Sequence, residues 1–471
     1  MSDSPVPDSP ASVLPSLSAL TRRALQRLDA WEASWGAAEP HPAVGVDPDR
    51  LDDAFGRYLD RLTDGNYPFH HPRYAGQMLK PPHPVALAAY FAAMRINPNN
   101  HALDGGPPTS HMEKDVVADL AAMLGLPDAT LGHLTSGGTV ANLEALWVAR
   151  TLHPNRGVAF SADAHYTHGR MCGVLGLDAV ALPTDPLGRL RLDALAEALA
   201  DGSIGTVVLT PGTTGLGSVD PIREAINVCR DGGARVHIDA AYGGFFRLLA
   251  HDDAPPIEGF PADDFRAIAD ADSVAIDPHK HGLQPYGCGC ILFRDPAVGR
   301  FYQHDSPYTY FTSDDLHLGE ISLECSRAGA AAGALWCTLQ ALPLAPTDGV
   351  GAIVGACLRA ARRWAEAVRA ADGLTLYAAP QTDIVAYFPT PEAPTLSAVH
   401  AASQRVFEAA MHDPDDPLFT SLYRVPAADF TALHPSFEAD RDDVAILRSV
   451  LMKPEHETHA ASLVARLAAF V

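Results

Sequence analysis

The chain has 471 residues, of which 47% are hydrophobic and 19% are charged, and its formal net charge is −23. A chain of this length is expected to form more than one domain, because single cores rarely grow past about 250–300 residues. A surface this acidic repels phosphate backbones and anionic lipid, so the composition argues against nucleic acid and membrane partners.

The cysteines and the N-terminus indicate where the protein works. The seven cysteines form no CxxC pair, and their spacing predicts reduced thiols with no structural zinc. The opening residues MSDSPVPDSP lack the basic and apolar parts of a signal peptide, and every apolar run is shorter than the ~20 residues of a membrane span. We therefore expect a soluble, cytoplasmic protein.

Three regions follow one another along the chain. Residues 1–100 read as a short disordered tail and a helical arm with Pro-rich breaks, such as HPRYAGQMLKPPHP. Residues 101–345 alternate short β-branched runs with amphipathic stretches, which predicts a large domain built on a mostly parallel sheet. Residues 346–471 read as a smaller C-terminal α+β domain that opens with a helix over 350–370.

The large domain is predicted to be an α/β sheet covered by helices on both faces. Its predicted strands are 158–161, 179–182, 206–210, 235–239, 273–277 and one around 290–293. Its predicted helices are 140–152, 191–200 and 221–230. Open parallel sheets bind ligands at the carboxyl ends of their strands, so the residues just after each strand are the candidates for a site.

The segment LTSGGTVANLEALWVAR (134–150) is a short loop that runs directly into a helix. The backbone N–H groups of Gly137, Gly138 and Thr139, together with the helix dipole, form an anion site of phosphate size. An ordinary helix start with Ser136 as its N-cap would give the same pattern. No Gly-Lys-Ser/Thr follows, so this is not a Walker loop.

Two further segments place charged residues at strand ends. In RVHIDAAYGGFF, Asp239 can pair with a protonated ring nitrogen and Ala241 is small enough for a flat ring to lie against it, although an acid here can also cap the next turn. In DPHKH, Lys280 follows a buried strand, and a desolvated lysine of this kind forms Schiff bases. The alternative is an exposed lysine in a turn.

SADAHYTHGRMC also follows a strand, and its His165 is placed to stack on a ring. His165 and His168 have metal-like spacing, but no third ligand lies near them in the sequence, so we expect no metal. The order of the set is what matters. A phosphate loop, a histidine, Asp-x-Ala and His-Lys, each after its own strand, together predict binding of pyridoxal 5′-phosphate (PLP).

With these motifs, the sequence resembles the group II PLP-dependent amino acid decarboxylases, from about HPRYAG (71–76) to SRAGA (326–330). The resemblance implies PLP fold type I, the aspartate aminotransferase-like fold, and a homodimer with active sites shared between subunits. It implies that Lys280 is the Schiff-base lysine, that His279 binds phosphate, that Asp239 pairs with the ring nitrogen, and that Ala241 and His165 flank the ring. It also implies cofactor contacts from Gly138, Thr139, Thr213 and Ser273.

The resemblance implies a substrate pocket as well. Gln77 and Met78 are expected to line it, with Asn99 and His101 from the partner subunit. The loop HDSPYTYFTSDDLHLGE carries Tyr308 and Tyr310, which are the candidates for the residue that protonates the substrate carbon. The polar Asn99 and His101 favour a substrate side chain with a hydrogen-bonding group, such as a phenol, an imidazole or a carboxylate.

The expected reaction is decarboxylation of an L-amino acid to the amine and CO2, by a carboxy-lyase acting on a tyrosine-like or acidic substrate. The rivals on the same fold are a carbon–carbon lyase and an aminotransferase. A rival of another class is a catalytically silent PLP-binding protein, which the complete Asp/His/Lys set disfavours.

Overall fold

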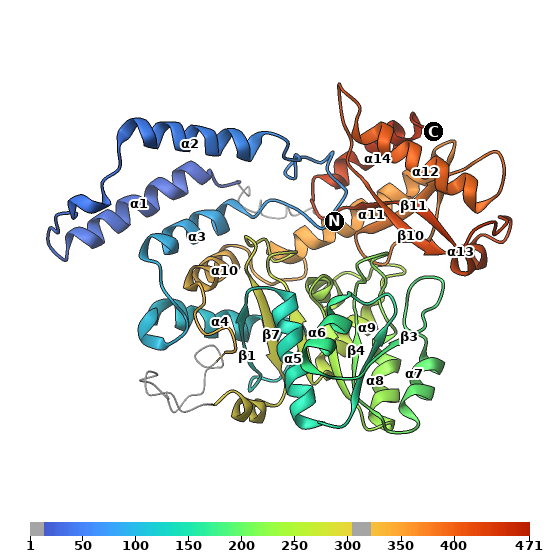
Figure 1. Cartoon of the computed structure of the whole chain (residues 1–471), viewed down its shortest axis with the longest axis horizontal. Coiled ribbons are helices and arrows are strands. Elements are labelled where there is room, and N and C mark those ends of the chain that lie inside the picture. Colours follow the sequence, from blue (N-terminus) through green and yellow to red (C-terminus); the bar gives the residue numbers. More distant parts are fainter. Residues whose placement is uncertain (1–13, 304–321) are drawn as a thin grey trace, which may run out of the picture.

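The computed structural model describes residues 14–303 and 322–471 (Figure 1). It contains a seven-stranded sheet in the middle of the chain and a four-stranded sheet near the C-terminus. No helix within the described residues is long and apolar enough to cross a membrane.

The seven-stranded sheet has the order β1-β7-β6-β5-β4-β2-β3. Its strands are β1 (Leu131–Thr135), β2 (Gly157–Ser161), β3 (Ala179–Leu182), β4 (Ile204–Leu209), β5 (Arg235–Asp239), β6 (Ser273–Ile276) and β7 (Gly289–Phe293). All neighbouring strands pair in parallel except β7, which is antiparallel to both β1 and β6. Strands β1, β4, β6 and β7 are buried at every residue, as apolar strands covered on both faces are.

Helices connect these strands and cover the sheet. They are α4 (Pro107–Leu124), α5 (Gly138–Leu152), α6 (Thr167–Leu175), α7 (Leu192–Leu199), α8 (Ile222–Asp231), α9 (Ala262–Ala267) and α10 (Gly329–Ala341). Helix α5 packs across β5, β6 and β7, which brings its N-terminus to the carboxyl edge of the sheet. The main core lies between the sheet and its helices and includes Phe245 and Phe246, both fully buried.

The C-terminal region has an antiparallel sheet of its own, in the order β10-β11-β9-β8. Its strands are β8 (Leu374–Leu376), β9 (Ile384–Pro389), β10 (Ser421–Pro426) and β11 (Asp443–Val450). Its helices are α11 (Gly349–Ala370), α12 (Leu396–Met411), α13 (Ala427–Leu433) and α14 (His456–Ala468). A separate core forms around Trp364 and Tyr387, and this region lies beside the carboxyl edge of the large sheet (Figure 1).

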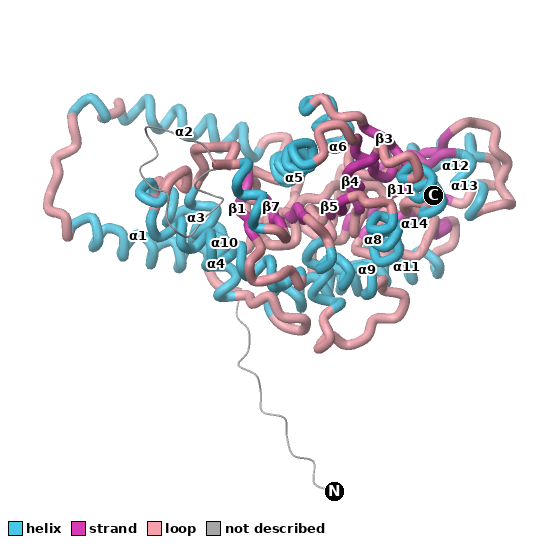
Figure 2. The backbone as a smooth tube through the Cα atoms, turned by 90° about the horizontal axis from the view of Figure 1, so that it is seen from below, coloured by secondary structure: helices cyan, strands magenta, loops and turns pink. Residues whose placement is uncertain are grey.

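The N-terminal arm consists of α1 (Leu17–Ala33), α2 (Pro48–Thr63) and α3 (Pro84–Ile96). Asp47 caps α2 by accepting the N–H of Arg50 at 3.0 Å. Neither α1 nor α2 has a buried residue, and both extend away from the sheet (Figures 1 and 2).

The predicted architecture is confirmed: an α/β fold with a mostly parallel large sheet and a smaller C-terminal α+β region. The predicted strands and helices are present, most with ends shifted by one or two residues. β1 was not predicted, because Gly132 and His133 interrupt its apolar pattern. The division into 1–100, 101–345 and 346–471 stays a prediction.

Candidate active site

A cavity of about 360 Å³ lies where several strands of the large sheet end. Its wall is made by residues that follow β1, β2, β4, β5 and β6. Eight residues predicted for the cofactor site line this cavity: Gly137, Gly138, Thr139, His165, Asp239, Ala241, His279 and Lys280. Residues from five separate segments therefore meet at one edge, where an open α/β sheet binds its ligand.

The start of α5 forms a cradle without side chains. No described side chain caps this helix, so its first N–H groups are available to a ligand. Gly137 has a φ of 153°, which L side chains rarely adopt. A Cβ atom on Gly138 would lie 2.8 Å from Asp277 Oδ2 and 3.2 Å from Ala241 Cβ. Both positions therefore require glycine, and the helix N-terminus suits an anion.

The Asp239 carboxylate is held from two sides. Its Oδ2 lies 2.9 Å from His168 Nε2, and its Oδ1 accepts the N–H of Ala241 at 3.2 Å. Burial acts to raise the pKa of Asp239, but the His168 hydrogen bond and the charge of Lys280 outweigh it and hold the pKa below its ordinary value. The site therefore keeps an anion at the end of β5.

Lys280 lies across the cavity from this acid, on the segment after β6. Its Nζ is 3.4 Å from Asp277 Oδ2, and the two side chains are 20% and 4% exposed. The Lys280 amine is thus paired with the carboxylate that lies three residues earlier in the chain. Asp277 Oδ1 is buried without a hydrogen-bond partner among the described residues, so the carboxylate retains acceptor capacity.

Two histidines of the cavity wall are held as neutral rings. Burial lowers the pKa of both His165 and His279. The ring of His279 donates from Nδ1 to the carbonyl of Cys288 at 2.9 Å and packs against Tyr286. The ring of His165 lies beside Tyr166, with centroids 4.4 Å apart. Neutral, oriented rings suit packing against a flat ligand.

Behind the cradle, a buried chain of hydrogen bonds orients α5. Asn142 donates to the carbonyl of Gly138 at 2.8 Å and accepts from His237 Nε2 at 2.7 Å. His237 Nδ1 is bonded to the Ser273 hydroxyl at 2.9 Å, and burial lowers the pKa of His237 to about 3. Ser273 thus bonds to His237 at the start of β6, and its predicted contact with the phosphate stays a prediction.

Other predicted residues lie beside the cavity or outside it. Gly212 and Thr214 line the cavity, whereas the hydroxyl of Thr213 accepts the N–H of Ser218 at 3.1 Å. Met78 does not line the cavity, and its carbonyl accepts a hydrogen bond at 3.5 Å from Tyr286, whose ring packs against His279 of the wall. Gln77 is exposed and does not line the cavity.

The residues expected to act across a subunit interface do not meet the cavity within one chain. The Asn99 side chain bonds to the backbone of His101 and Arg327. The role of Asn99 and His101 in the partner subunit's site stays a prediction. Tyr308 and Tyr310 lie outside the described residues.

Two residues of the site, Asp277 and His168, were not predicted from the sequence. Asp277 directly follows β6, as Asp239 ends β5, and that signal was available in the sequence. His168 was considered only as a metal ligand, and it lies in the first turn of α6, three residues after His165.

The chain matches the family model described as "Pyridoxal-dependent decarboxylase conserved domain" over residues 39–388. It is 31% identical over 415 residues to an L-tyrosine decarboxylase of Enterococcus faecium, covering 68% of this chain and 67% of that protein. It is 31% identical over 270 residues to a probable L-tyrosine/L-aspartate decarboxylase of Methanothermobacter thermautotrophicus, covering 57% and 70%.

Solved structures share the fold over nearly the whole chain. Oryza sativa TDC with PLP and tryptamine superposes with a TM-score of 0.75 at 17% identity, covering 96% of this chain and 97% of that one. Mouse CSAD in apo form superposes with a TM-score of 0.73 at 20% identity, covering 96% and 99%.

Proposed function

Because the chain belongs to the pyridoxal-dependent decarboxylase family, we propose that it decarboxylates an aromatic amino acid with a polar ring substituent, tyrosine above all. Family membership establishes an enzyme that uses PLP to remove CO2 from an amino acid. Of the reactions considered from the sequence, decarboxylation is the one this family carries out. The residue roles and the substrate are our proposals.

The groups around the cavity fit PLP, which carries a phosphate, a ring nitrogen and an aldehyde. The side-chain-free start of α5 suits the phosphate, since a Cβ atom on Gly138 would fill it. Asp239 is an anion for the ring nitrogen, and Lys280 is the amine for the aldehyde. Ala241 leaves room for the ring, and His165 packs against its other face.

The lysine content of the chain supports the role of Lys280. The 471 residues include four lysines, namely Lys80, Lys114, Lys280 and Lys453. Of these, Lys280 lines the cavity. We assign to it the covalent attachment of the cofactor.

When bound, PLP supplies an electron-accepting ring that allows the bond to the substrate carboxylate to break. Asp239 holds a proton on the ring nitrogen through a charge-assisted hydrogen bond, which lets that ring accept electrons. Asp277, whose Oδ2 lies 3.4 Å from Nζ, orients the amine of Lys280. Tyr308 or Tyr310 is our candidate for returning a proton to the substrate carbon.

One observation favours tyrosine over aspartate. Lys280 is the one lysine or arginine side chain that lines the cavity in the described part of the chain, and the cofactor consumes its amine. The segment 304–321 contains no lysine or arginine either. A substrate with a second carboxylate would find no lysine or arginine of the same chain to pair with it here, whereas a phenol needs only hydrogen bonds.

The test is CO2 release from each of the twenty amino acids, with kcat/KM measured for tyrosine, phenylalanine and aspartate. We expect tyrosine to exceed aspartate by about 100-fold or more, since an uncompensated buried charge costs about 3–5 kcal/mol. A preference for aspartate would contradict the proposal, and activity on phenylalanine alone would contradict the polar pocket.

We propose that the chain forms a homodimer through its N-terminal arm. Helix α2 has a stripe of apolar residues that the rest of the described chain does not cover: Leu51, Phe55, Tyr58, Leu59 and Leu62, each 43–58% exposed. Their spacing puts them on one face of the helix, and a second copy of the chain is the partner we propose for that face.

The seven cysteines are all free thiols, which supports a cytoplasmic location.

A further inference from the structure

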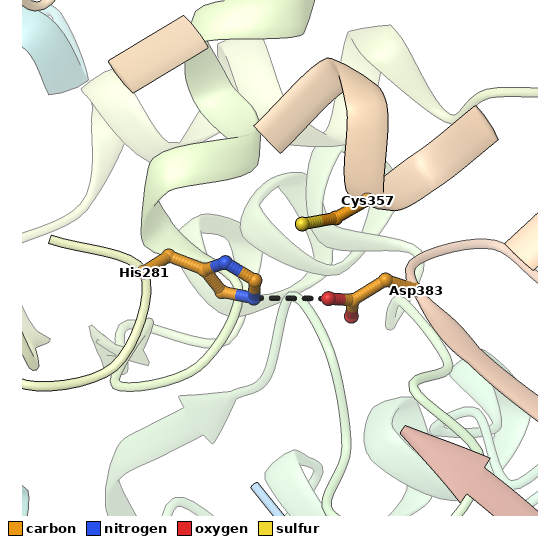
Figure 3. A group of neighbouring side chains, drawn as sticks. All are labelled: His281, Cys357 and Asp383. Atoms are coloured by element: carbon orange, nitrogen blue, oxygen red, sulfur yellow. Dashed lines mark ion pairs between the residues drawn. The ribbon is translucent and has the colours of Figure 1, made fainter. Parts of the chain in front are cut away.

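A fully buried carboxylate of the C-terminal region lies behind the cofactor edge of the large sheet. Asp383 immediately precedes β9, and its Oδ1 accepts a hydrogen bond from Tyr242 Oη at 2.5 Å. Its Oδ2 lies 3.2 Å from His281 Nε2. Figure 3 shows the His281–Asp383 pair with Cys357 of α11 extending toward it. Three elements distant in sequence therefore meet at this one acid.

The two partners of Asp383 are chain neighbours of proposed cofactor residues. Tyr242 follows Ala241, and His281 follows Lys280. The ring of His281 packs between the rings of Tyr242 and Phe246, with centroids 5.0 and 5.2 Å apart. A shift of Asp383 would therefore be passed on to the segments after β5 and β6.

The residues just before Asp383 contact a third segment. Gln381 Oε1 accepts the N–H of Val219 at 3.0 Å, and the Thr382 hydroxyl donates to the carbonyl of Gly217 at 2.9 Å. A Cβ atom on Gly217 would collide with Thr382 Oγ1, so the two backbones approach closely. Both contacts lie in the loop that leaves the cavity after β4. Residues 381–383 thus bind three loops that begin at the cavity wall.

A metal centre is the competing interpretation of this cluster. His281, Cys357 and Asp383 offer nitrogen, sulfur and oxygen atoms within 4.8 Å of one another, a donor set that zinc accepts. Two observations disfavour it. The described residues offer three such groups, one fewer than a structural zinc site uses, and Asp383 Oδ1 already accepts a hydrogen bond from Tyr242.

We propose that Asp383 is a positioning residue through which the C-terminal region sets the geometry of the cofactor site, by holding Tyr242 and His281. The inference rests on the proposed role of Lys280. Asp383 is fully buried and Tyr242 is 4% exposed, so no bulk water replaces a lost contact. Misplacement of a reacting group by about 1 Å costs on the order of 100-fold in rate.

The test compares Asp383→Ala, Asp383→Asn, Tyr242→Phe and the control Cys357→Ala. The dissociation constant of PLP is measured by titrating each apoprotein, and kcat and KM are measured on the holoenzymes. We expect Asp383→Ala to weaken PLP binding and lower kcat by about 100-fold, with KM for the amino acid little changed. Asp383→Asn retains an acceptor for Tyr242 and should recover part of the loss. Tyr242→Phe should lose about tenfold, and Cys357→Ala should match the parent.

Two results would overturn the inference. One is parental PLP affinity and kcat in Asp383→Ala. The other is a stoichiometric metal in the parent protein that Cys357→Ala releases together with the activity. If Asp383→Ala fails to fold by circular dichroism, Tyr242→Phe decides, and parental values there reject the role. A parent protein that attaches no PLP at Lys280 rejects the proposed function instead, whatever the variants do.

Discussion

The carboxyl edge of the large sheet and the N-terminal arm differ in where their partners come from. At the edge, the charged and polar side chains that carry the site have partners within the same chain, as in Asp239 with His168, Lys280 with Asp277, and Asn142 with Gly138. In the arm, no residue of α1 or α2 is buried. The groups at the edge are therefore preorganised by contacts within one chain, whereas the contacts that we propose for the arm come from a second copy of the chain.

The largest effect is expected at the edge, from Asp239→Ala. This change removes the anion that we place opposite the ring nitrogen, and losing a preorganised electrostatic partner of this kind costs about 10²–10³ in kcat. Steady-state decarboxylation assays measure it, with thermal unfolding as the check on the fold. Asp263→Ala, which removes an exposed acid from a surface ion pair, is the matched control and should change nothing. Near-parental turnover of Asp239→Ala would remove Asp239 from the mechanism.

A smaller effect is expected one step back from the cavity, from His168→Phe. This change takes away the 2.9 Å contact to Asp239 but leaves the hydrogen bond from the Ala241 N–H. A hydrogen bond to a charged group contributes about 1.5–3 kcal/mol, so turnover should fall about tenfold or somewhat more. His168→Gln, which retains a donor, should recover part of it. Equal rates in the parent and His168→Phe would mean that Asp239 needs no second partner.

The smallest effect on the folded chain is expected in the arm. Phe55→Asp together with Leu59→Asp should dissociate the dimer, because both side chains lie on the exposed apolar face of α2. The free energy of unfolding of one chain should change by no more than about 0.5 kcal/mol, as at other exposed sites. Light scattering reports the mass, and Asp60→Ala on the opposite face of α2 is the control. A double variant that stays dimeric would show that this face is not the interface.

Elements that local periodicity defines are predicted from the sequence, whereas elements that depend on distant pairing are not. Strands β3 and β5 and helix α11 follow from local periodicity, and their predicted bounds agree with the structure to within one residue. Strand β1 does not follow from local periodicity, because its place in the sheet is decided by antiparallel pairing with β7, about 155 residues later in the chain. Hydrophobic periodicity carries no information on such pairings.

Site residues that follow a strand are predicted from the sequence, whereas residues that act through distant contacts are not. Asp239, His165 and Lys280 are found because each follows its own strand, and parallel strands bring those ends together. Ser273 instead starts β6, one strand length from the edge, and its role at the cofactor stays a prediction. Asp383 has no signal in the sequence at all, since it acts through contacts with residues more than 100 positions away.

The central claim is that Lys280 carries the cofactor, and borohydride reduction of the PLP-loaded protein followed by peptide mass spectrometry tests it most directly. Reduction makes the lysine–cofactor bond permanent, and the chain offers only four lysines. The account predicts the label on the peptide that contains Lys280, and a Lys280→Ala protein that is colourless and unlabelled. A label on Lys80, Lys114 or Lys453, or an unchanged yellow band in Lys280→Ala, would contradict it.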